Sequence, residues 1–146
     1  MDTIDDLNPP EIVAAVRKSQ GRKTENKRNK FGAIPCKADG YSFDSKGERA
    51  YYFQLKMLAA GGIIENLEVH PKPRYVLQAA FTADNGEEIP AITHGPDFRW
   101  VDPATSNTVV ADFKGRQLTA WKIRYRLFRK VYPHIPYVVA TKKDLR

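Results

Sequence analysis

Three charged residues near the middle of the sequence have types and a spacing that suit phosphate chemistry. Asp97 follows a proline in the segment HGPDF, and Asp112 and Lys114 lie in the segment VVADFKG. A turn-forming stretch, residues 102–107, separates the two segments, and an order of strand, loop and strand is typical of a β-hairpin. We therefore expect the two acids to lie on neighbouring antiparallel strands.

The register of this hairpin decides whether the charged side chains meet. If Val101 pairs with Thr108 across the loop, Asp97 lies opposite Asp112, and the Cβ atoms of such a pair are about 5 Å apart. Two carboxylates at that separation repel each other unless a cation lies between them. Lys114 is two residues after Asp112, so its side chain leaves the same face of the strand. Two acids and a lysine on one face can bind a divalent metal and a phosphate, as a metal-dependent nuclease requires.

Glu48 is a third acid whose position favours the same site. Residues 45–60 are predicted to form a helix, with Asp44 or Ser45 as the N-cap and Gly61-Gly62 at the end. The helix carries an apolar stripe four, seven and eleven residues after Glu48, made up of Tyr52, Leu55 and Ala59. A charged residue at the head of such a stripe points toward the sheet. A capping bond between Glu48 and Ser45 is the simpler explanation, and the two roles can coexist.

These residue types match the needs of metal-assisted hydrolysis. Hard divalent cations such as Mg²⁺ take oxygen ligands and keep several waters. Asp97 and Asp112 would supply carboxylate oxygens. The Phe113 carbonyl would supply a neutral oxygen, and Glu48 would bind directly or through water. The metal would lower the pKa of a bound water, while Lys114 would orient that water or stabilise developing negative charge.

A basic segment follows the hairpin. From Phe113 through Lys143 there is no acidic residue, but there are nine lysines or arginines. Residues 119–132 are predicted to form a helix whose aromatic residues recur at core spacing. The candidate DNA-binding residues are Arg116, Lys122, Arg126, Arg129 and Lys130. Their charges favour contact with phosphates, and a merely solvated helix face is the alternative.

The other elements indicate an α/β protein. The order along the chain is helix, several strands, helix, strand. The predicted extended segments are Tyr41–Phe43, 63–69, 74–81, 88–93 and 137–141, with a hairpin turn at 84–86. Three histidines, His70, His94 and His134, are scattered through the chain, and His94 is the one close in sequence to Asp97.

Charge and composition restrict the class of protein. The chain has 146 residues, a net charge of +7 and a pI of about 9.5, which suits a polyanionic partner. The single cysteine, Cys36, excludes an internal disulfide and a cysteine-rich zinc site. No apolar run approaches the ~18 residues of a membrane span, and the acidic N-terminus is not a signal peptide. We therefore expect a cytoplasmic protein with no membrane partner.

Two regions are predicted. Residues 1–30 contain a short helix at 9–19 and a flexible basic arm at 22–30 in which no residue is apolar. Residues 31–146 form the compact domain. The arm is either a solvated tail or a segment that contacts phosphates.

Four sequence blocks together resemble the PD-(D/E)XK nuclease superfamily. They are YSFDSKGERAYYFQLKMLAAGGIIENLEVHPKP, HGPDF, VVADFKG and FRKVYP, and the resemblance covers about residues 29–141. More closely, the chain is similar to a small phage and prophage family of previously unknown function, whose core resembles that of phage Holliday-junction resolvases. Asp112 stands where many members of the superfamily have Glu, and the shorter side chain reduces the reach to a metal.

This resemblance implies a restriction-endonuclease-like α/β fold with a central mixed sheet flanked by helices. It implies an endonuclease that hydrolyses DNA phosphodiester bonds with Mg²⁺ or Mn²⁺ as cofactor. The catalytic positions would be Glu48, Asp97, Asp112 and Lys114. It further implies branched or junction DNA as the substrate, in phage recombination or replication within a bacterial host, and a protein able to act as a homodimer.

Two other functions fit the sequence. A non-catalytic DNA-binding or assembly protein on a nuclease-like fold would need the basic helix but not the acids. The complete set of three acids and a lysine argues against it. A nicking, restriction-type or RNA-cleaving nuclease would use the same site on another substrate, although a chain of this length leaves little room for a separate sequence-reading domain.

Overall fold

The computed structural model describes residues 36–145. The predicted helix at 9–19 and the basic arm at 22–30 lie outside these residues. The described part of the chain divides into two compact units, both within residues 31–146, which the sequence predicts to form one compact domain. The sheet unit comprises residues 36–71, 96–116 and 134–145, and the ribbon unit comprises residues 72–95 and 117–133. No helix of residues 36–145 is both long and apolar enough to span a membrane.

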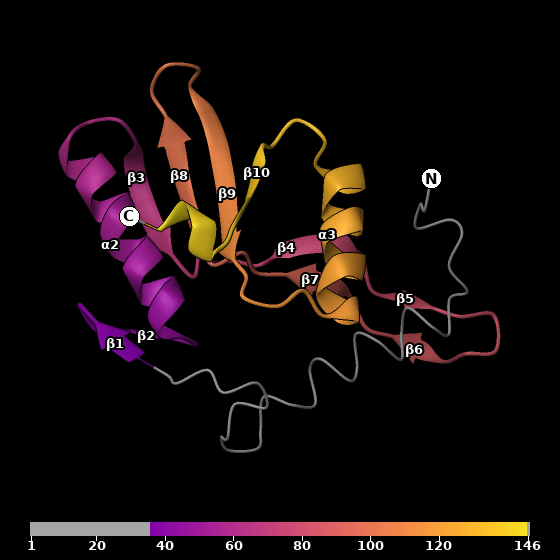
Figure 1. The fold of residues 1–146 in the computed structure, drawn as a ribbon. Coiled ribbons are helices and arrows are strands. Elements are labelled where there is room, and N and C mark those ends of the chain that lie inside the picture. Colours follow the sequence, from indigo (N-terminus) through magenta and orange to yellow (C-terminus); the bar gives the residue numbers. More distant parts are fainter. Residues whose placement is uncertain (1–35, 146) are drawn as a thin grey trace. The chain divides into compact units, whose positions relative to one another are not determined.

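The sheet unit is built on a four-stranded mixed sheet (Figure 1). Its strands are β3 (Glu65–Val69), β8 (Phe98–Asp102), β9 (Asn107–Phe113) and β10 (Tyr137–Ala140). Their order is β10-β9-β8-β3, with β10 parallel to β9 and the other neighbours antiparallel. This arrangement confirms the predicted class, an α/β fold with a central mixed sheet, and it is compatible with a restriction-endonuclease-like core.

The β8–β9 hairpin has the predicted register. Val101 pairs with Thr108, and at the other end of β8 Phe98 pairs with Ala111. The residue before Phe98 is Asp97, so continuing the same register places it opposite Asp112. The turn is closed by the Asp102 carbonyl, which accepts hydrogen bonds from the backbone N–H groups of the loop. The spacing of apolar and turn residues was therefore sufficient to align these two strands.

The helix α2 (Lys46–Ala60) begins and ends as predicted. The Ser45 hydroxyl accepts a hydrogen bond from the Glu48 N–H at 3.1 Å, which satisfies one of the unpaired donors of the first turn. Gly61 caps the C-terminus, and Gly62 takes a positive φ of 74° that suits glycine. The first turn is thereby fixed where Glu48 lies.

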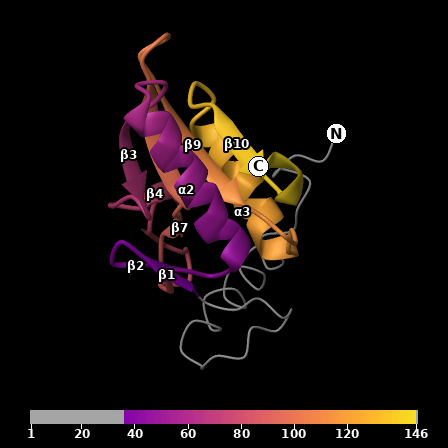
Figure 2. The same ribbon diagram turned by 60° about the vertical axis from the view of Figure 1, so that its left-hand side comes forward.

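The apolar face of α2 packs on one face of the sheet (Figure 2). Tyr52 and Leu55 are buried, as the predicted stripe requires, and Tyr51 joins them. From the sheet, Phe98, Trp100, Val109, Ala111 and Phe113 complete the core. A short hairpin of β1 (Cys36–Ala38) and β2 (Tyr41–Phe43) precedes α2, and Phe43 enters the same core.

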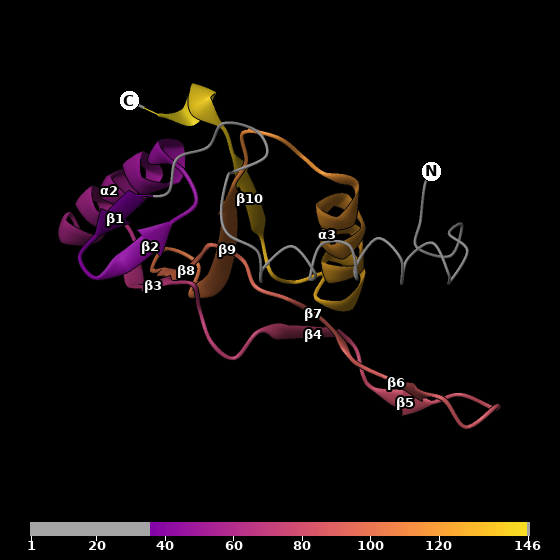
Figure 3. The same cartoon turned by 90° about the horizontal axis from the view of Figure 1, so that it is seen from below.

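The ribbon unit contains the second helix and a narrow antiparallel ribbon (Figure 3). In the ribbon β4 (Tyr75–Gln78) pairs with β7 (Ile92–His94), and beyond them β5 (Phe81–Thr82) pairs with β6 (Glu88–Ile89). The predicted strands at 74–81 and 88–93 are each broken in two. Pro90 lies at one break, where it cannot donate a ladder hydrogen bond.

The helix α3 (Thr119–Val131) packs on this ribbon within the same unit. The Phe128 ring lies 5.0 Å from the Tyr75 ring and 6.0 Å from the His94 ring, centroid to centroid. The Tyr132 hydroxyl donates to the Val76 carbonyl. In the sheet unit, β10 ends one residue earlier than predicted because Thr141 caps a short 3₁₀ helix, η2 (Lys142–Asp144).

Candidate metal and phosphate site

Three polar residues occupy one row across the sheet. Val69, Phe98 and Ala111 are register partners on β3, β8 and β9. The next row toward the same end of the sheet holds His70, Asp97 and Asp112. The His70 N–H donates to the Asp97 carbonyl at 2.8 Å, which continues the pairing of β3 with β8 by one residue. Residues directly opposite in antiparallel strands share a face, so the three side chains gather on one side of the sheet.

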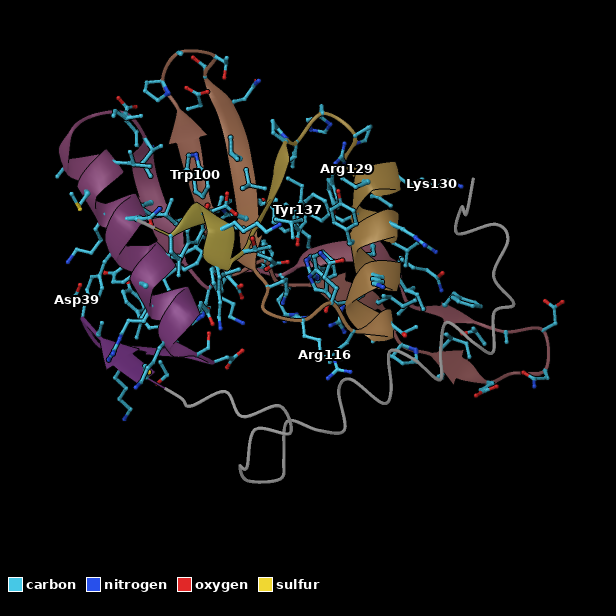
Figure 4. All side chains as sticks on the ribbon, viewed as in Figure 1. Asp39, Trp100, Arg116, Arg129, Lys130 and Tyr137 are labelled. Atoms are coloured by element: carbon cyan, nitrogen blue, oxygen red, sulfur yellow. The ribbon has the colours of Figure 1, made fainter. Side chains whose placement is uncertain are left out.

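Asp97 and Asp112 are tied together by backbone groups. The Asp97 N–H donates to Asp112 Oδ1 at 2.8 Å, and the Phe113 N–H donates to Asp97 Oδ2 at 2.9 Å. The second oxygen of Asp112 accepts a hydrogen bond from the hydroxyl of Tyr137, on β10 (Figure 4). The Asp112 side chain is 1% exposed. The two predicted acids therefore meet, and each carboxylate is held in place by donors from a neighbouring strand.

Glu48 brings a third carboxylate from α2, and it also caps the helix. Its Oε2 accepts the Asp44 N–H at 3.0 Å, one residue before the N-cap, while its own N–H bonds to Ser45. Its Oε1 lies 3.3 Å from Nε2 of His70. The residue as a whole is buried, with 3% of its surface exposed. The capping role and a place in the acid cluster thus coexist, as the sequence allowed.

A glycine lets α2 approach the end of β9. A Cβ atom on Gly47 would lie 2.5 Å from the ring of Phe113, a distance that real side chains do not tolerate. Phe113 is buried, and its ring also lies 6.0 Å from that of Tyr51. The absence of a side chain on Gly47 therefore allows the first turn of α2, with Glu48, to lie close to the strand that carries Asp112.

One group of side chains has the geometry of a metal site. Single ligand atoms of Glu48, His70 and Asp97 all lie within 4.8 Å of one another. Two ligands that share an ion at about 2.1 Å are at most about 4.2 Å apart, so a small adjustment would bring all three onto one cation. The donors are two carboxylate oxygens and one imidazole nitrogen, which fits a divalent metal. Asp112 is not in this group.

The charges around Asp97 raise its pKa. Burial raises the pKa of this carboxyl well above its usual value, and the carboxylate of Asp112 raises it further. The ammonium of Lys114 acts in the opposite direction, Glu48 raises the pKa again, and the hydrogen bond from the Phe113 N–H lowers it. The other three predicted catalytic side chains therefore all act electrostatically on Asp97. A cation would relieve the repulsion among the three acids.

Lys114 follows Phe113 at the end of β9. Its N–H donates to the Ala140 carbonyl at 2.8 Å, so its backbone is fixed by β10. The side chain is half-buried. Arg116 follows in the exposed loop after β9 (Figure 4). The sheet unit thus contains all four predicted catalytic residues, the Phe113 backbone and one of the predicted DNA-binding residues.

The other predicted DNA-binding residues lie on α3, in the ribbon unit. Lys122, Arg129 and Lys130 are exposed, and Arg126 is partly buried. Arg129 and Lys130 project from the last turn of the helix (Figure 4). Among the aromatic residues of α3, Trp121 and Phe128 are buried, which confirms that this stripe packs.

Sequence reasoning missed two residues that contact the acids. The three histidines are scattered in sequence, so spacing does not single out His70, and the pattern around Tyr137 predicts only a strand. Each reaches the cluster through strand pairing, His70 beside β8 and Tyr137 beside β9. No local sequence pattern marks either residue. His70 takes a positive φ of 48°, a backbone conformation in which histidine is enriched, but this conformation is visible only in the structure.

Comparison with known proteins identifies a family but no activity. The family model described as "Protein of unknown function (DUF1064)" matches residues 28–144, which include every site residue described above. Neither a curated protein nor a solved structure shows a significant match to the chain. Because the family model covers most of its length, the chain belongs to the DUF1064 family.

Proposed function

We propose that this protein is a Mg²⁺- or Mn²⁺-dependent endonuclease that hydrolyses phosphodiester bonds in DNA. One observation carries the proposal: Asp97 and Asp112 lie side by side at the end of the β8–β9 hairpin, within electrostatic reach of Glu48 and Lys114. Gathering three acids raises the free energy of the native state unless a cation or proton compensates. Such an arrangement is typical of a functional site rather than of a packed core.

The residues present suit a hard or borderline divalent ion. Asp97 and Glu48 would hold it through carboxylate oxygens, and the resemblance to the PD-(D/E)XK superfamily adds Asp112 and the Phe113 carbonyl. When bound, the metal supplies a water of lowered pKa and neutralises charge on the phosphate. The hydrogen bonds from backbone N–H groups to Asp97 and Asp112 keep those carboxylates oriented, so little reorganisation is needed when phosphate arrives.

Lys114 would contribute positive charge at the reacting phosphate. Its ammonium already acts electrostatically on Asp97. A charged lysine can orient the attacking water and stabilise negative charge as the bond from water to phosphorus forms. The attacking water gives up a proton to solvent, the bond from phosphorus to the leaving oxygen breaks, and the leaving oxygen takes up a proton from solvent.

DNA is the substrate that the charge distribution favours. The chain carries a net charge of +7. The helix α3 has no acidic residue among its thirteen residues, and it carries three exposed basic side chains. Basic side chains that follow a phosphate backbone bind it without regard to sequence. Preference for branched or junction DNA, and a role in phage recombination or replication, rest on the resemblance alone.

The proposal is tested by cleavage of labelled DNA. Pure full-length protein would be incubated with linear, nicked, flapped and four-way DNA, with Mg²⁺ or Mn²⁺ and with a chelator. We expect metal-dependent cleavage of at least one substrate, and none by Asp97→Asn. Asp102→Asn is the matched control, because Asp102 lies at the far end of the same strand and should be dispensable. DNA binding without cleavage of any substrate would favour the non-catalytic alternative.

A further inference from the structure

His70 is held beside the acids by both its backbone and its side chain. Its N–H bonds to the Asp97 carbonyl at 2.8 Å, and its backbone φ of 48° is unusual for a residue other than glycine. Its Nε2 lies 3.3 Å from Glu48 Oε1, and its ring lies 5.9 Å from the Phe43 ring. The position of this imidazole is therefore determined by β8, by α2 and by the aromatic core.

The imidazole of His70 belongs to the group of three ligand atoms. One of its ring nitrogens and carboxylate oxygens of Glu48 and Asp97 lie within 4.8 Å of one another. The His70 side chain is 41% exposed, whereas the Glu48 side chain is 4% exposed. The group is therefore closed on the side of α2 and accessible to solvent on the side of His70, as a site that exchanges metal and substrate requires.

A nitrogen ligand changes which metal the site prefers. Mg²⁺ takes oxygen ligands almost exclusively. First-row transition ions also accept oxygen but bind imidazole as well. A site with two carboxylates and one histidine therefore discriminates against Mg²⁺ more than a site built from oxygen atoms alone.

We infer that His70 binds the metal through its imidazole nitrogen and makes the site prefer Mn²⁺ to Mg²⁺. This inference rests on the metal site of the proposed function, and it adds a ligand that the acidic motif does not contain. On this inference, His70 and Glu48 lie close together because both side chains face the position of one metal ion. The opposing explanation is that His70 only forms an ion pair with Glu48 and never bonds to metal.

Spectroscopy of the Mn²⁺-loaded protein separates the two explanations. Electron spin-echo experiments detect nitrogen bonded directly to Mn²⁺, independently of any cleavage. The samples are the native full chain, His70→Asn, His70→Gly and the control His134→Asn. Asparagine and glycine both tolerate a positive φ, so the two His70 variants should keep the backbone. His134 is exposed and lies outside the row of polar residues.

We expect a nitrogen signal in the native protein and in His134→Asn, and its loss in both His70 variants. Titration of Mn²⁺, and of Mg²⁺ by competition, should show the Mn²⁺ affinity falling at least about tenfold in His70→Gly, since removing even an outer partner of a ligand costs that much. The Mg²⁺ affinity should change by less than about threefold, so the ratio of the two affinities should fall.

Two results would overturn the inference. One is Mn²⁺ bound to the native protein without a nitrogen signal, and the other is a signal that survives in both His70 variants. Either result leaves the proposed function intact if DNA is still cleaved and Asp97→Asn still abolishes cleavage. Failure of the native protein to bind Mn²⁺ or Mg²⁺ and to cleave any DNA would remove both proposals together.

Discussion

The two helices of the described chain place opposite charges at opposite ends. In α2 the Ser45 side chain caps the N-terminus, the first turn holds an acid, Glu48, and the last turn holds no basic residue. In α3 the N-cap is Leu118, which makes no side-chain cap, the first turn holds no acid, and the last turn holds Arg129 and Lys130. Glu48 in the first turn of α2, and Arg129 and Lys130 in the last turn of α3, lie where the helix dipole favours their charges.

This difference indicates two kinds of specialisation. In α2 a single charged side chain is buried and precisely positioned, which costs free energy and requires a cap, a glycine and a nearby histidine. In α3 several charged side chains are exposed, which costs little and requires no particular geometry. On the proposed function, α2 serves the chemistry and α3 serves attachment to the phosphate backbone. The predictions below test whether the two contributions can be separated.

The largest effect is expected from Glu48→Gln. Glutamine keeps the size of the side chain and can still accept the Asp44 N–H, but it removes one negative charge from the metal site. Loss of several kcal/mol of charge stabilisation corresponds to about a thousandfold slower cleavage. DNA affinity should be unchanged or higher, because less negative charge faces the phosphate. Glu65→Gln, an exposed acid on β3, is the control. Cleavage at the native rate by Glu48→Gln would remove α2 from the chemistry.

The next effect is on DNA binding. Lys122→Glu combined with Lys130→Glu should weaken binding to every DNA sequence alike and leave the metal site unchanged. The slope of log K against log salt should flatten by roughly 0.9 for each phosphate that the variant no longer neutralises. Salt titrations in an Asp97→Asn background would measure this without cleavage.

A matched pair of reversals on α2 controls for net charge. Lys46→Glu with Lys56→Glu makes the same change in net charge, and both lysines are exposed. If α3 follows the phosphate backbone, the α3 pair should flatten the salt slope more than the α2 pair. Equal slopes for both pairs would mean that overall charge, rather than α3, determines DNA affinity.

A smaller effect concerns stability and pH. The pKa of Asp97 is raised in the native state, so folding favours its protonated form. The contribution of protonated Asp97 to the free energy of unfolding is therefore complete below 3.8, the ordinary pKa of an aspartate. It is lost as the pH rises through the raised pKa that Asp97 has in the folded protein. Asp97→Asn, which stays neutral, should therefore be more stable than the native protein at pH 8 without metal, and the difference should vanish near pH 3. Thermal unfolding across this range measures it, and an unchanged difference would show that charge is not the cause.

The smallest effects involve the helix caps. Ser45→Ala should lower the free energy of unfolding by about 1 kcal/mol, because it removes the acceptor for the Glu48 N–H. Leu118→Ser should raise the free energy of unfolding by up to about 1 kcal/mol, because the serine hydroxyl can supply the side-chain cap that α3 lacks. Urea unfolding of the two variants compares them. Ser45→Ala should also slow cleavage if the cap positions Glu48, whereas Leu118→Ser should not.

The parts of the site that could be predicted are those encoded by local spacing. Pairing of Val101 with Thr108 followed from a short turn between two apolar segments, and it placed Asp97 beside Asp112. The cap at Ser45 and the inward position of Glu48 followed from helical periodicity. These features depend on residues that are close in sequence, where the geometry of strand and helix fixes the outcome.

The parts that could not be predicted depend on pairing between distant strands. His70 reaches Asp97 through the pairing of β3 with β8, which contains an irregularity between Glu65 and Glu68 that no spacing rule anticipates. Tyr137 reaches Asp112 through the parallel pairing of β10 with β9, and α3 intervenes between those strands in sequence. The strands of the ribbon are shorter than predicted, because the alternation of apolar and polar residues does not show where the hydrogen bonds between the two strands are interrupted.

The row of His70, Asp97 and Asp112 has a consequence for misfolded molecules. Side chains alternate between the faces of a sheet, so a slip of one residue between β8 and β9 would send Asp97 and Asp112 to opposite faces. A chain with that error would contain every acid and yet lack the candidate metal site. On the proposed function, DNA cleavage would therefore arise only in correctly paired molecules. The strand register would act as a safeguard that needs no separate inhibitor.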